Sequence, residues 1–512
     1  MNNKVKQDCF VFFLETLFSG LVCQLLKKYK KHSSNHNVHF NTDQINRFPI
    51  QNMANIGQET PLSIRSTRIM GAVRTHSSKI ENELQDAYNA STVGELFVAL
   101  EKAVVSLRNT GAFRSVNITL AGTPDRDAAM TDVVVTIEEK GLFNLGLNAL
   151  TSVNGEHTGD TSLKVINALG RCETIAFTGS VGTKASNTSQ ATLTQPKFMG
   201  YPLGFQAVVE RRRANNCETS SHNEKNKHIG MNVSTEDQAH RVGWDLTFRD
   251  LVPLRDEKTP YAKLASREVL YDCSQPSLKN AFSYLFTQDT RDNRLSPRTG
   301  SLLKVKAESA GVLGGDVYFN SLLLTAQHNI PVGPSQIFGG LRGCTLALGL
   351  RVGGVMAFGA DAKRAQEQDV TGVRLCDRFN TGGPFCFRGF PSSGIGPRAA
   401  PVAENKINPN GDTLGAEAVG VISARLDFPP PVAVLADFGL RTHVYANVGN
   451  LVPVQKISTE FMKTWRGAAG IGVAYNLNNA FRLELNYNLW HRNQDYDQIA
   501  PGWQWGLGVD FL

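Results

Sequence analysis

The segment Gly382–Arg398, GGPFCFRGFPSSGIGPR, places one arginine between aromatic side chains in a stretch of glycine, proline and serine. The planar guanidinium of Arg388 suits a bidentate pair with a carboxylate. Gly389 lets the backbone turn sharply beside it, and Phe387 and Phe390 could shield such a pair from water. Two placements remain open: a solvated arginine at a rim, or a loop folded inward with Arg388 docked on an acid.

No pattern in the chain matches a catalytic or metal site. The motifs GxSxG, HExxH and GxxxxGK[ST] do not occur in the sequence. The eight cysteines are scattered and form no CxxC pair, which argues against a zinc ribbon and a disulfide framework. We therefore expect no catalytic residue, no metal and no cofactor, and we do not expect an enzyme.

The charge of the chain is dispersed. The formal net charge is +7, and charged residues make up 19% of the chain, below the usual share of about 25%. The short basic runs at 27–31 and 211–213 do not build the basic, aromatic-rich surface that nucleic-acid binding needs. The sequence therefore argues against nucleic acid as a partner.

Residues 1–60 are expected to be an extension or linker. The segment Cys9–Leu26 is apolar and is followed by KKYKK, but it carries Glu15 and Gln24. A charged residue at the centre of a membrane helix costs about 2.5–3.5 kcal/mol on insertion scales. Three interpretations stay open for this segment: an anchor, a targeting segment or an unstructured extension.

Residues 64–140 have the pattern of a small α+β domain. TVGE at Thr92–Glu95 is a capping box, and the apolar residues after it recur at the spacing of one helix face. Two strands are expected, at Arg114–Leu120 and Thr131–Glu139. The expected core of this domain includes Phe113, Ile118 and Val133.

From residue 141 to 512 the dominant pattern is strict alternation. In FRLELNYN, Phe481–Asn488, four apolar residues oppose Arg482, Glu484 and two asparagines. A soluble sandwich also alternates, but alternation over about 370 residues exceeds ordinary sandwich size. Tryptophan and tyrosine at the ends of the apolar faces are typical of the aromatic girdles of membrane barrels.

These features predict a mainly β fold. At 9–11 residues per strand plus turns, about 16 strands fit. In hydrocarbon only a closed barrel pairs every backbone group. We therefore predict a transmembrane antiparallel β-barrel over 141–512, with apolar residues outside and polar residues lining the lumen, preceded by the α+β domain at 64–140.

The segment DRFNTGGPFCFRGFPSSGIGPR, Asp377–Arg398, resembles the sixth-loop motif of the outer-membrane barrel-assembly superfamily, whose barrels follow POTRA domains. Similar segments occur in family order at Gln288–Val305, Tyr445–Asn450 and Gly506–Leu512, and residues 68–139 resemble a single POTRA repeat. Within this superfamily the sequence most resembles the central barrel subunits of the mitochondrial sorting and assembly machinery.

The resemblance implies a loop lock inside the barrel. Its members would be Gly382, Gly383, Phe387, Arg388, Gly389 and Phe390. A wall acid that receives the arginine falls at Asp427 in SARLDFP, so Asp427→Ala would be expected to disorder the loop. A second wall acid of bacterial relatives is replaced by Asn447, which can accept a hydrogen bond but cannot neutralise charge.

The resemblance also implies an insertase in the mitochondrial outer membrane, with the POTRA domain in the intermembrane space. Its partners would be unfolded β-barrel precursors, accessory assembly subunits and the lipid bilayer. A lateral gate would lie between the first strand, at about 142–152, and the last, at about 503–512. The residues assigned to this gate and its sorting-signal-like strand are Leu147, Gln504, Gly506, Gly508, Val509 and Phe511.

Two alternatives remain open at this stage. A protein-translocating barrel of the same superfamily, from the plastid or secretion branch, would share the loop motif. A passive metabolite pore would share the alternation, but it has no use for a POTRA domain or for an inward-docked arginine.

Overall fold

The computed structural model describes the chain in nine stretches. They are residues 59–122, 130–151, 157–255, 264–332, 343–368, 371–403, 405–430, 439–477 and 481–508. The chain divides into two compact units: one comprises residues up to 142 together with 165–174, and the other comprises 143–164 and 175–512. The N-terminal segment Cys9–Leu26 lies outside the described residues.

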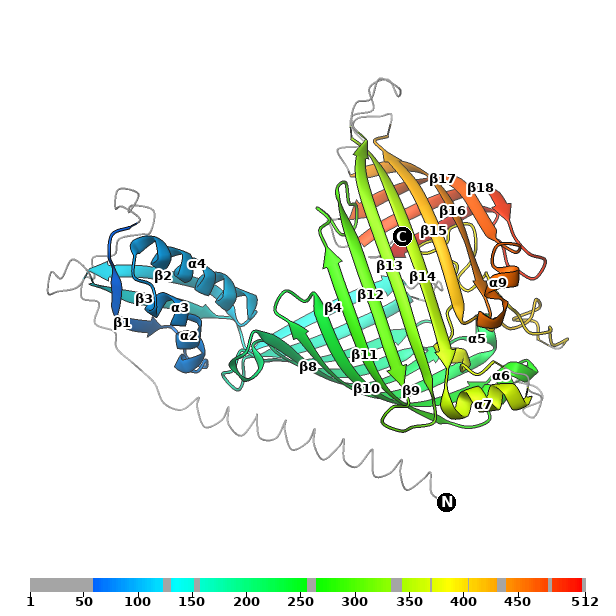
Figure 1. The fold of residues 1–512 in the computed structure, drawn as a ribbon, viewed down its shortest axis with the longest axis horizontal. Helices are drawn as coiled ribbons and strands as arrows, with labels where there is room; N and C mark the ends of the chain where they lie inside the picture. The colour runs from blue at the N-terminus through cyan, green and yellow to red at the C-terminus, as the bar shows by residue number, and fades with distance from the viewer. Residues whose placement is uncertain are drawn as a thin grey trace, which may run out of the picture. The chain divides into compact units, whose positions relative to one another are not determined.

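The first unit is a three-stranded sheet covered by helices (Figure 1). Its elements are β1 (Ser63–Met70), α2 (Ser77–Glu83), α3 (Gln85–Tyr88), α4 (Val93–Asn109), β2 (Phe113–Gly122) and β3 (Met130–Glu139). The strand order is β1-β3-β2, with β1 parallel and β2 antiparallel to β3. The predicted helix and both predicted strands are therefore present.

Capping and burial explain why this unit folds as the sequence indicates. The Thr92 side chain accepts a hydrogen bond from the Glu95 backbone N–H, and the Glu95 carboxylate accepts one from the Ser91 N–H, which together form a capping box. Leu96 and Leu100 of α4 pack in one buried cluster with residues of β2 and β3. The three predicted core residues, Phe113, Ile118 and Val133, are all buried there.

A turn from later in the sequence belongs to this unit. Residues 165–174 include Asn167, whose side-chain amide donates to Thr75 Oγ1 at 2.7 Å. The His76 backbone N–H donates to the Gly170 carbonyl at 3.0 Å, and Cys172 enters the buried cluster. Burial raises the pKa of the Cys172 thiol to about 11, so this cysteine stays protonated and unreactive at neutral pH.

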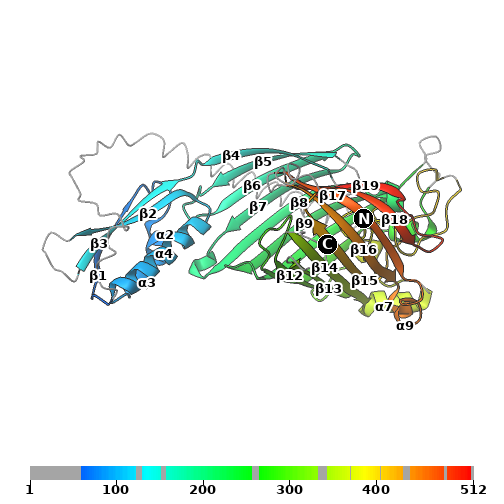
Figure 2. The ribbon, with the colours of Figure 1, turned by 90° about the horizontal axis from the view of Figure 1, so that it is seen from above.

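The second unit is one sixteen-stranded sheet that curls into a barrel (Figures 1 and 2). Its strands are β4 (Phe143–Thr151), β5 (His157–Ile166), β6 (Thr174–Gly182), β7 (Asn187–Gln195), β8 (Leu203–Asn215), β9 (His222–Thr235), β10 (His240–Pro253), β11 (Ser277–Asp289), β12 (Gly300–Ala310), β13 (Phe319–Val332), β14 (Cys344–Ala357), β15 (Ala418–Phe428), β16 (Leu440–Val452), β17 (Arg466–Leu477), β18 (Phe481–Arg492) and β19 (Gly502–Gly508). They lie in sequence order, with β4 and β19 at the two ends of the sheet. The prediction of about 16 antiparallel strands is confirmed.

The strands are polar on the inside and apolar on the outside. On β18, Arg482, Glu484 and Asn486 have no exposed area, whereas Leu483 and Leu485 are 43% and 42% exposed. A soluble sandwich would bury the leucines and expose the charged residues. The inverted pattern is that of a barrel whose outer wall contacts hydrocarbon.

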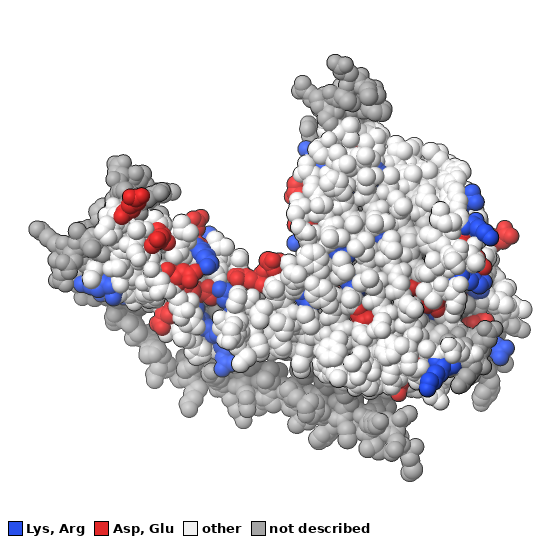
Figure 3. Space-filling model, viewed as in Figure 1, with Lys and Arg blue, Asp and Glu red and all other residues white. Residues whose placement is uncertain are grey.

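Other strands repeat this arrangement on the outer wall. Ile422 on β15 is 61% exposed, and Trp503 and Trp505 on β19 are 68% and 53% exposed. Figure 3 shows that the face over β12 to β15 is nearly free of charged side chains, which gather toward its margins. An apolar belt bounded by charged ends matches the cross-section of a bilayer.

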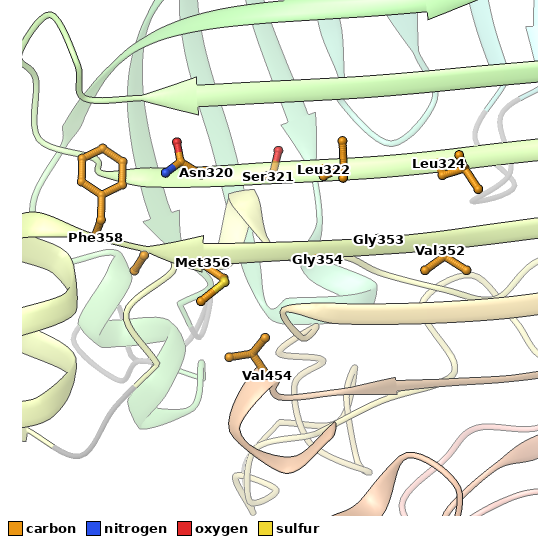
Figure 4. Close-up of a pocket in the computed structure, with 11 residues that line it drawn as sticks. Asn320, Ser321, Leu322, Leu324, Val352, Gly353, Gly354, Met356, Phe358 and Val454 are labelled. Carbon is orange, nitrogen blue, oxygen red and sulfur yellow. The ribbon is translucent and has the colours of Figure 1, made fainter. Parts of the chain in front are cut away.

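A groove of about 720 Å³ follows the outer wall between β13 and β14 (Figure 4). Leu322 and Leu324 line it from β13, Val352 and Met356 line it from β14, and Val454 lies at its edge. Because the lining is mostly apolar and faces the membrane, the groove suits lipid acyl chains better than a polar substrate.

Short helices connect some strands. They are η2 (Phe198–Gly200), α5 (Cys217–Ser220), α6 (Arg267–Asp272), α7 (Gly359–Gln368), η4 (Leu375–Asp377), η5 (Val454–Lys456) and α9 (Ile457–Glu460). Helices of three to ten residues show too little periodicity to be predicted from sequence. Across the described residues, none of the helices is both long and apolar enough to cross a membrane.

The outward direction of Ile422 yields a stability prediction. Ile422→Arg places a charge near the middle of a lipid-facing strand, so we expect the free energy of unfolding to fall by about 2–4 kcal/mol. Urea unfolding in lipid vesicles measures this change, with Ile422→Leu as the control. An Ile422→Arg protein as stable as the control would contradict a lipid-facing outer wall.

Candidate functional site: an arginine loop docked inside the barrel

The long connection between β14 and β15, residues 358–417, contacts strands that are far apart in the sheet. Near its start, Asp377 binds Arg249 of β10, and further on Arg388 binds Glu484 of β18. Their strand partners, Arg249 and Glu484, are both buried on the polar face of the sheet. A single connection that reaches β10 and β18 must lie inside the curve of the sheet, so this connection occupies the lumen.

Arg388 is completely buried and forms a bidentate pair with Glu484. Its Nε donates to one carboxylate oxygen at 3.0 Å, and its Nη2 donates to the other at 3.2 Å. Neither side chain has exposed area. Of the two placements that the sequence leaves open, the structure has the inward one.

The expectation that Asp427 receives Arg388 is wrong. Asp427 accepts instead from the Nε of Arg425, at 3.1 Å, which is two residues away on the same face of β15. Arg388 pairs with an acid of β18 and not with this acid of β15. Glu484 lies on β18 and presents both oxygens to the guanidinium.

Glu484 is the centre of a larger buried charge cluster. Besides its bonds from Arg388, Glu484 accepts a hydrogen bond from Arg425 Nη1 at 3.4 Å and forms an ion pair with Arg482 Nη2 at 2.8 Å. Arg482 also lies 3.9 Å from Asp427. Two acids therefore serve three arginines, so the loss of Glu484 would leave several buried cations short of counter-charge.

Asn447 and Tyr445 of β16 hold the loop in other ways. With its amide oxygen facing the loop, Asn447 accepts a hydrogen bond from the Arg388 backbone N–H at 2.9 Å. The Arg388 guanidinium carbon lies 5.6 Å from the centre of the Tyr445 ring, within reach of a cation–π contact. Asn447 thus contacts the loop backbone, where an uncharged acceptor is sufficient.

The two phenylalanines form an apolar seal beside the ion pair. Phe387 and Phe390 are fully buried, with ring centres 5.3 Å apart in an edge-to-face arrangement. They pack with Val419 and Val421 of β15 and Leu451 of β16. This cluster excludes water from the loop, which strengthens the neighbouring electrostatic contacts.

Two glycines of the loop are required by their backbone conformations. Gly389 has φ +89°, and a Cβ there would lie 2.5 Å from the Ala468 Cβ. Gly382 has φ +130°, and a Cβ there would lie 2.2 Å from the Pro391 carbonyl oxygen. Gly383 also has positive φ, and it hydrogen-bonds through its N–H to Phe390. A side chain at 389 would push the loop off the wall, and one at 382 would clash with the loop's own backbone.

The last strand contacts the same loop. Gln504 of β19 accepts from the Gly389 N–H at 2.9 Å and donates to the Phe390 carbonyl at 2.8 Å. Gly506 approaches so closely that a Cβ there would lie 2.7 Å from Pro384. Two residues predicted for the gate strand therefore belong to the loop's binding surface.

The other predicted gate residues lie elsewhere or outside the described chain. Gly508 pairs with Arg482 in the β18–β19 ladder. Leu147 of β4 is 74% exposed on the outer wall. Val509 and Phe511 lie outside the described residues.

The tail of the loop is fixed by a second buried ion pair. Asp497, from the connection between β18 and β19, binds Arg466 of β17 at 2.8 and 3.2 Å. The same carboxylate accepts from the Gly396 backbone N–H at 3.2 Å. The Ile-Gly-Pro part of the motif is thus held next to the last two strands.

The head of the loop is fixed on the opposite wall. Asp377 accepts from both Nη atoms of Arg249, at 2.7 and 3.0 Å, and from Lys279 Nζ of β11 at 3.2 Å. Burial alone would raise the pKa of the Asp377 carboxyl, but Arg249 and Lys279 outweigh it and hold that pKa below its ordinary value of 3.8. This anchor is therefore fully formed at neutral pH and is lost only as the pH falls through the lowered pKa.

Sequence reasoning missed Glu484, Asp377, Arg249 and Asp497 as functional partners. For Glu484 a signal existed, because the alternation of β18 already placed Arg482, Glu484 and Asn486 on one face. For the Asp377–Arg249 pair none existed, since the two residues are 128 positions apart. Only the closure of the barrel brings them together.

The arrangement is a structural lock. Its acids are paired with arginines and its apolar part excludes water. In the parts of the chain that the structure describes, no group of three or more His, Cys, Asp or Glu residues could hold a metal ion. What the site can do chemically is fix a loop in the lumen and bind that loop to the terminal strand.

Comparisons with known proteins agree with this architecture. Residues 167–511 match the family described as the Omp85 superfamily domain. The chain is similar to the "Sorting and assembly machinery component 50 homolog" of Mus musculus, with 30% identity over 455 residues, covering 86% of this chain and 89% of the relative. It is also similar to "SAM50-like protein CG7639" of Drosophila melanogaster, with 27% identity over 460 residues, covering 87% and 94%.

The fold is also similar to that of a solved bacterial structure. BamA from Haemophilus ducreyi lacking POTRA domains 1–3 superposes with a TM-score of 0.68 at 17% sequence identity, covering 87% of this chain and 84% of that chain. At this identity the likeness concerns the fold alone.

The central role of Glu484 can be tested by removing its charge. Glu484→Gln leaves Arg388 buried without a counter-charge, and breaking a buried pair costs about 3–5 kcal/mol. We expect protease cleavage within residues 382–398 to accelerate strongly in the folded protein. Asp427→Asn is the matched control and should have a smaller effect, because Arg425 still contacts Glu484. Equal cleavage rates for the two variants would show that Glu484 is not the principal partner.

The role of Gln504 has its own test. Gln504→Ala removes the acceptor of the Gly389 N–H, and an unsatisfied buried donor costs about 1–3 kcal/mol. Phe390 keeps its hydrogen bond from Gly383, so we expect partial loosening only. Amide hydrogen exchange at Gly389 should become faster, whereas Trp503→Phe, on the outward face of the same strand, should leave it unchanged. Unaltered exchange in Gln504→Ala would exclude this clamp.

Proposed function

Because the chain belongs to the Omp85 superfamily, we propose that it is an insertase that folds β-barrel precursors and releases them into the mitochondrial outer membrane. The observation that carries this proposal is a sixteen-stranded barrel with an arginine loop docked in its lumen, in a chain that matches sorting-and-assembly proteins over 86–88% of its length. Its partners would be unfolded precursors, accessory outer-membrane subunits and the bilayer. Insertion would proceed without a cofactor and without a covalent step.

The route that we propose uses the joint between β4 and β19. These strands are the ends of the sheet, and the glycines at 506 and 508 give β19 little side-chain packing. An opened strand edge presents unpaired N–H and C=O groups that a precursor strand can pair with. The barrel would therefore act as a template for the first strand pairing of its client.

The contacts of β19 suggest which side of the joint moves. β19 is paired with β18 over seven positions and is bound to the loop through Gln504. β19 would therefore stay with the loop while β4 separates, and the freed edge of β4 would receive the precursor. Leu147, exposed on β4, would then lie beside the entering strand.

We further propose that the unit around β1–β3 is a POTRA domain in the intermembrane space. Its helices pack on a sheet of order β1-β3-β2, as a POTRA repeat requires. In this order β1 and β2 are the outer strands, and either could receive an extended client segment by pairing.

A passive metabolite pore is less well supported. A pore needs an open lumen, whereas here the connection 358–417 is anchored across the interior to β10, to β18 and to Asp497 of the β18–β19 connection. A translocating barrel of the same superfamily would share these features and is distinguished by its client.

Depletion of the protein in its source cell, followed by assembly assays of other outer-membrane barrels, tests the proposal that the protein is an insertase. Slowed assembly supports an insertase, and normal assembly contradicts it.

A photocrosslinking amino acid at position 147 tests the route. We expect it to capture the terminal strand of an arriving barrel precursor during import into isolated mitochondria. The same amino acid at Val352, which is outward on β14 and 46% exposed, is the matched control and should capture no precursor. Equal capture at both positions would reject entry at β4 while leaving the insertase proposal standing.

A further inference from the structure

Four basic side chains lie on adjacent strands of the outer wall. They are Arg211 and Arg213 of β8 and Lys225 and Lys227 of β9. In the β8–β9 ladder Arg211 stands directly opposite Lys227, and Arg213 directly opposite Lys225. We call these four residues the basic cluster.

The ladder shows that the basic cluster faces outward. Lys227 is two and four positions before Ile229 and Met231 on β9, so all three share one face of the strand. Met231 is 47% exposed, and Val233, two positions further, is 37% exposed, as expected for the lipid-facing side. His228, on the other face, lies 3.5 Å from Asp245 within the polar interior.

The positive charges of the basic cluster are not balanced by ion pairs within the described chain. Like charges directly opposite each other on neighbouring strands repel and destabilise the pair. Among the described residues, none of the four makes an ion pair with an acid of this chain. Asp250 of β10 stands across from Lys225 in the ladder, which leaves the outward patch with an excess of three positive charges.

Such a cluster is unusual on this barrel. Across β7 to β19, whose registers are described, the other charged side chains of the strands point into the lumen apart from Asp250 and Arg492. Arg492 is already occupied, because its guanidinium carbon lies 4.0 Å from the centre of the Trp465 ring. The outward positive charge is therefore concentrated at one place.

The cluster lies at one end of the apolar belt. β8 and β9 have 13 and 14 residues, more than the 9–11 that a tilted strand needs to cross hydrocarbon. The apolar outward positions of β8 end at Val209, and the basic residues follow. The turn that joins the two strands contacts the loop, because Ser220 donates to the Thr413 carbonyl at 2.7 Å. The basic cluster therefore lies at the level of the lipid headgroups, at the end of the barrel where the β8–β9 turn contacts the connection 358–417.

We propose that the basic cluster is a binding site for the phosphate-bearing headgroups of anionic phospholipids in that leaflet. Two arginines can each pair bidentately with a phosphate, and the two lysines add flexible point charges beside them. An anionic headgroup supplies the counter-charge that the chain itself lacks. The apolar residues next to the cluster, Val209 and Ile229, would contact the acyl chains of the same lipid.

An acidic face of a partner protein is the competing occupant. The geometry favours lipid because the basic side chains continue the rows that contact hydrocarbon and point sideways into the membrane plane. Long basic side chains in this position extend toward the phosphate layer.

The test compares lipid retention in variants of the full chain. The protein is reconstituted in vesicles of phosphatidylcholine mixed with phosphatidylinositol, extracted mildly, and its bound lipids are counted by native mass spectrometry. The probe is phosphatidylinositol, and its enrichment over phosphatidylcholine is the readout. We expect R211Q/R213Q/K225Q/K227Q to lose at least about tenfold in this enrichment, since each basic residue near a charged membrane contributes severalfold.

Two matched control variants leave the charge of the basic cluster unchanged. R211K/R213K keeps all four charges but loses the bidentate fork, so it should lose much less of the enrichment than the quadruple variant. R212Q removes one charge from the same strand on its lumen-facing side and should also retain it. If the quadruple variant fails to fold, R211Q/K227Q removes one opposed pair only and should give a smaller loss.

Equal phosphatidylinositol enrichment in the wild-type and quadruple-variant proteins would overturn the proposal. If the quadruple variant then also loses accessory subunits in co-purification, the cluster belongs to an interface with an acidic protein surface.

Discussion

A guanidinium buried inside a barrel requires a counter-charge that is equally buried and fixed in place. Glu484 meets this requirement for Arg388, with both carboxylate oxygens engaged and no exposed area on either residue. The cost of leaving such a charge unpaired is several kcal/mol, comparable with the whole stability of many domains. The position of the loop, and with it the contents of the lumen, therefore depends on this pair.

The loop is fixed inside the barrel at two further points besides the Arg388–Glu484 pair. The loop is bound at its head to β10 through Asp377, at its centre to β18 through Arg388, and at its tail to β17 through Asp497. These contacts brace the wall from within. Gln504 extends the brace to β19, so the last strand is held on its inner face. Under the proposed function, the barrel therefore opens where β19 meets β4.

Much of this architecture could be predicted from the sequence, and the failures have physical reasons. Strict alternation predicted about sixteen strands because a barrel wall repeats one local rule along its length. The inward direction of Arg388 was left open, and its partner was assigned to Asp427. Local sequence cannot show that Asp427 accepts from Arg425 of its own strand and not from the loop. Glu484 was visible as a polar residue on β18, but its pairing depends on which strand the loop crosses. The pair between Asp377 and Arg249 depends wholly on closure of the sheet.

The most direct test is a double-mutant cycle between Arg388 and Glu484, read as the opening free energy of the loop from amide hydrogen exchange at residues 387–390 in lipid bilayers. We predict that the Arg388→Ala and Glu484→Ala effects are strongly non-additive, with a coupling of about 2–3 kcal/mol. The double variant would then open little more readily than either single variant. Additive effects of the two substitutions would contradict the account.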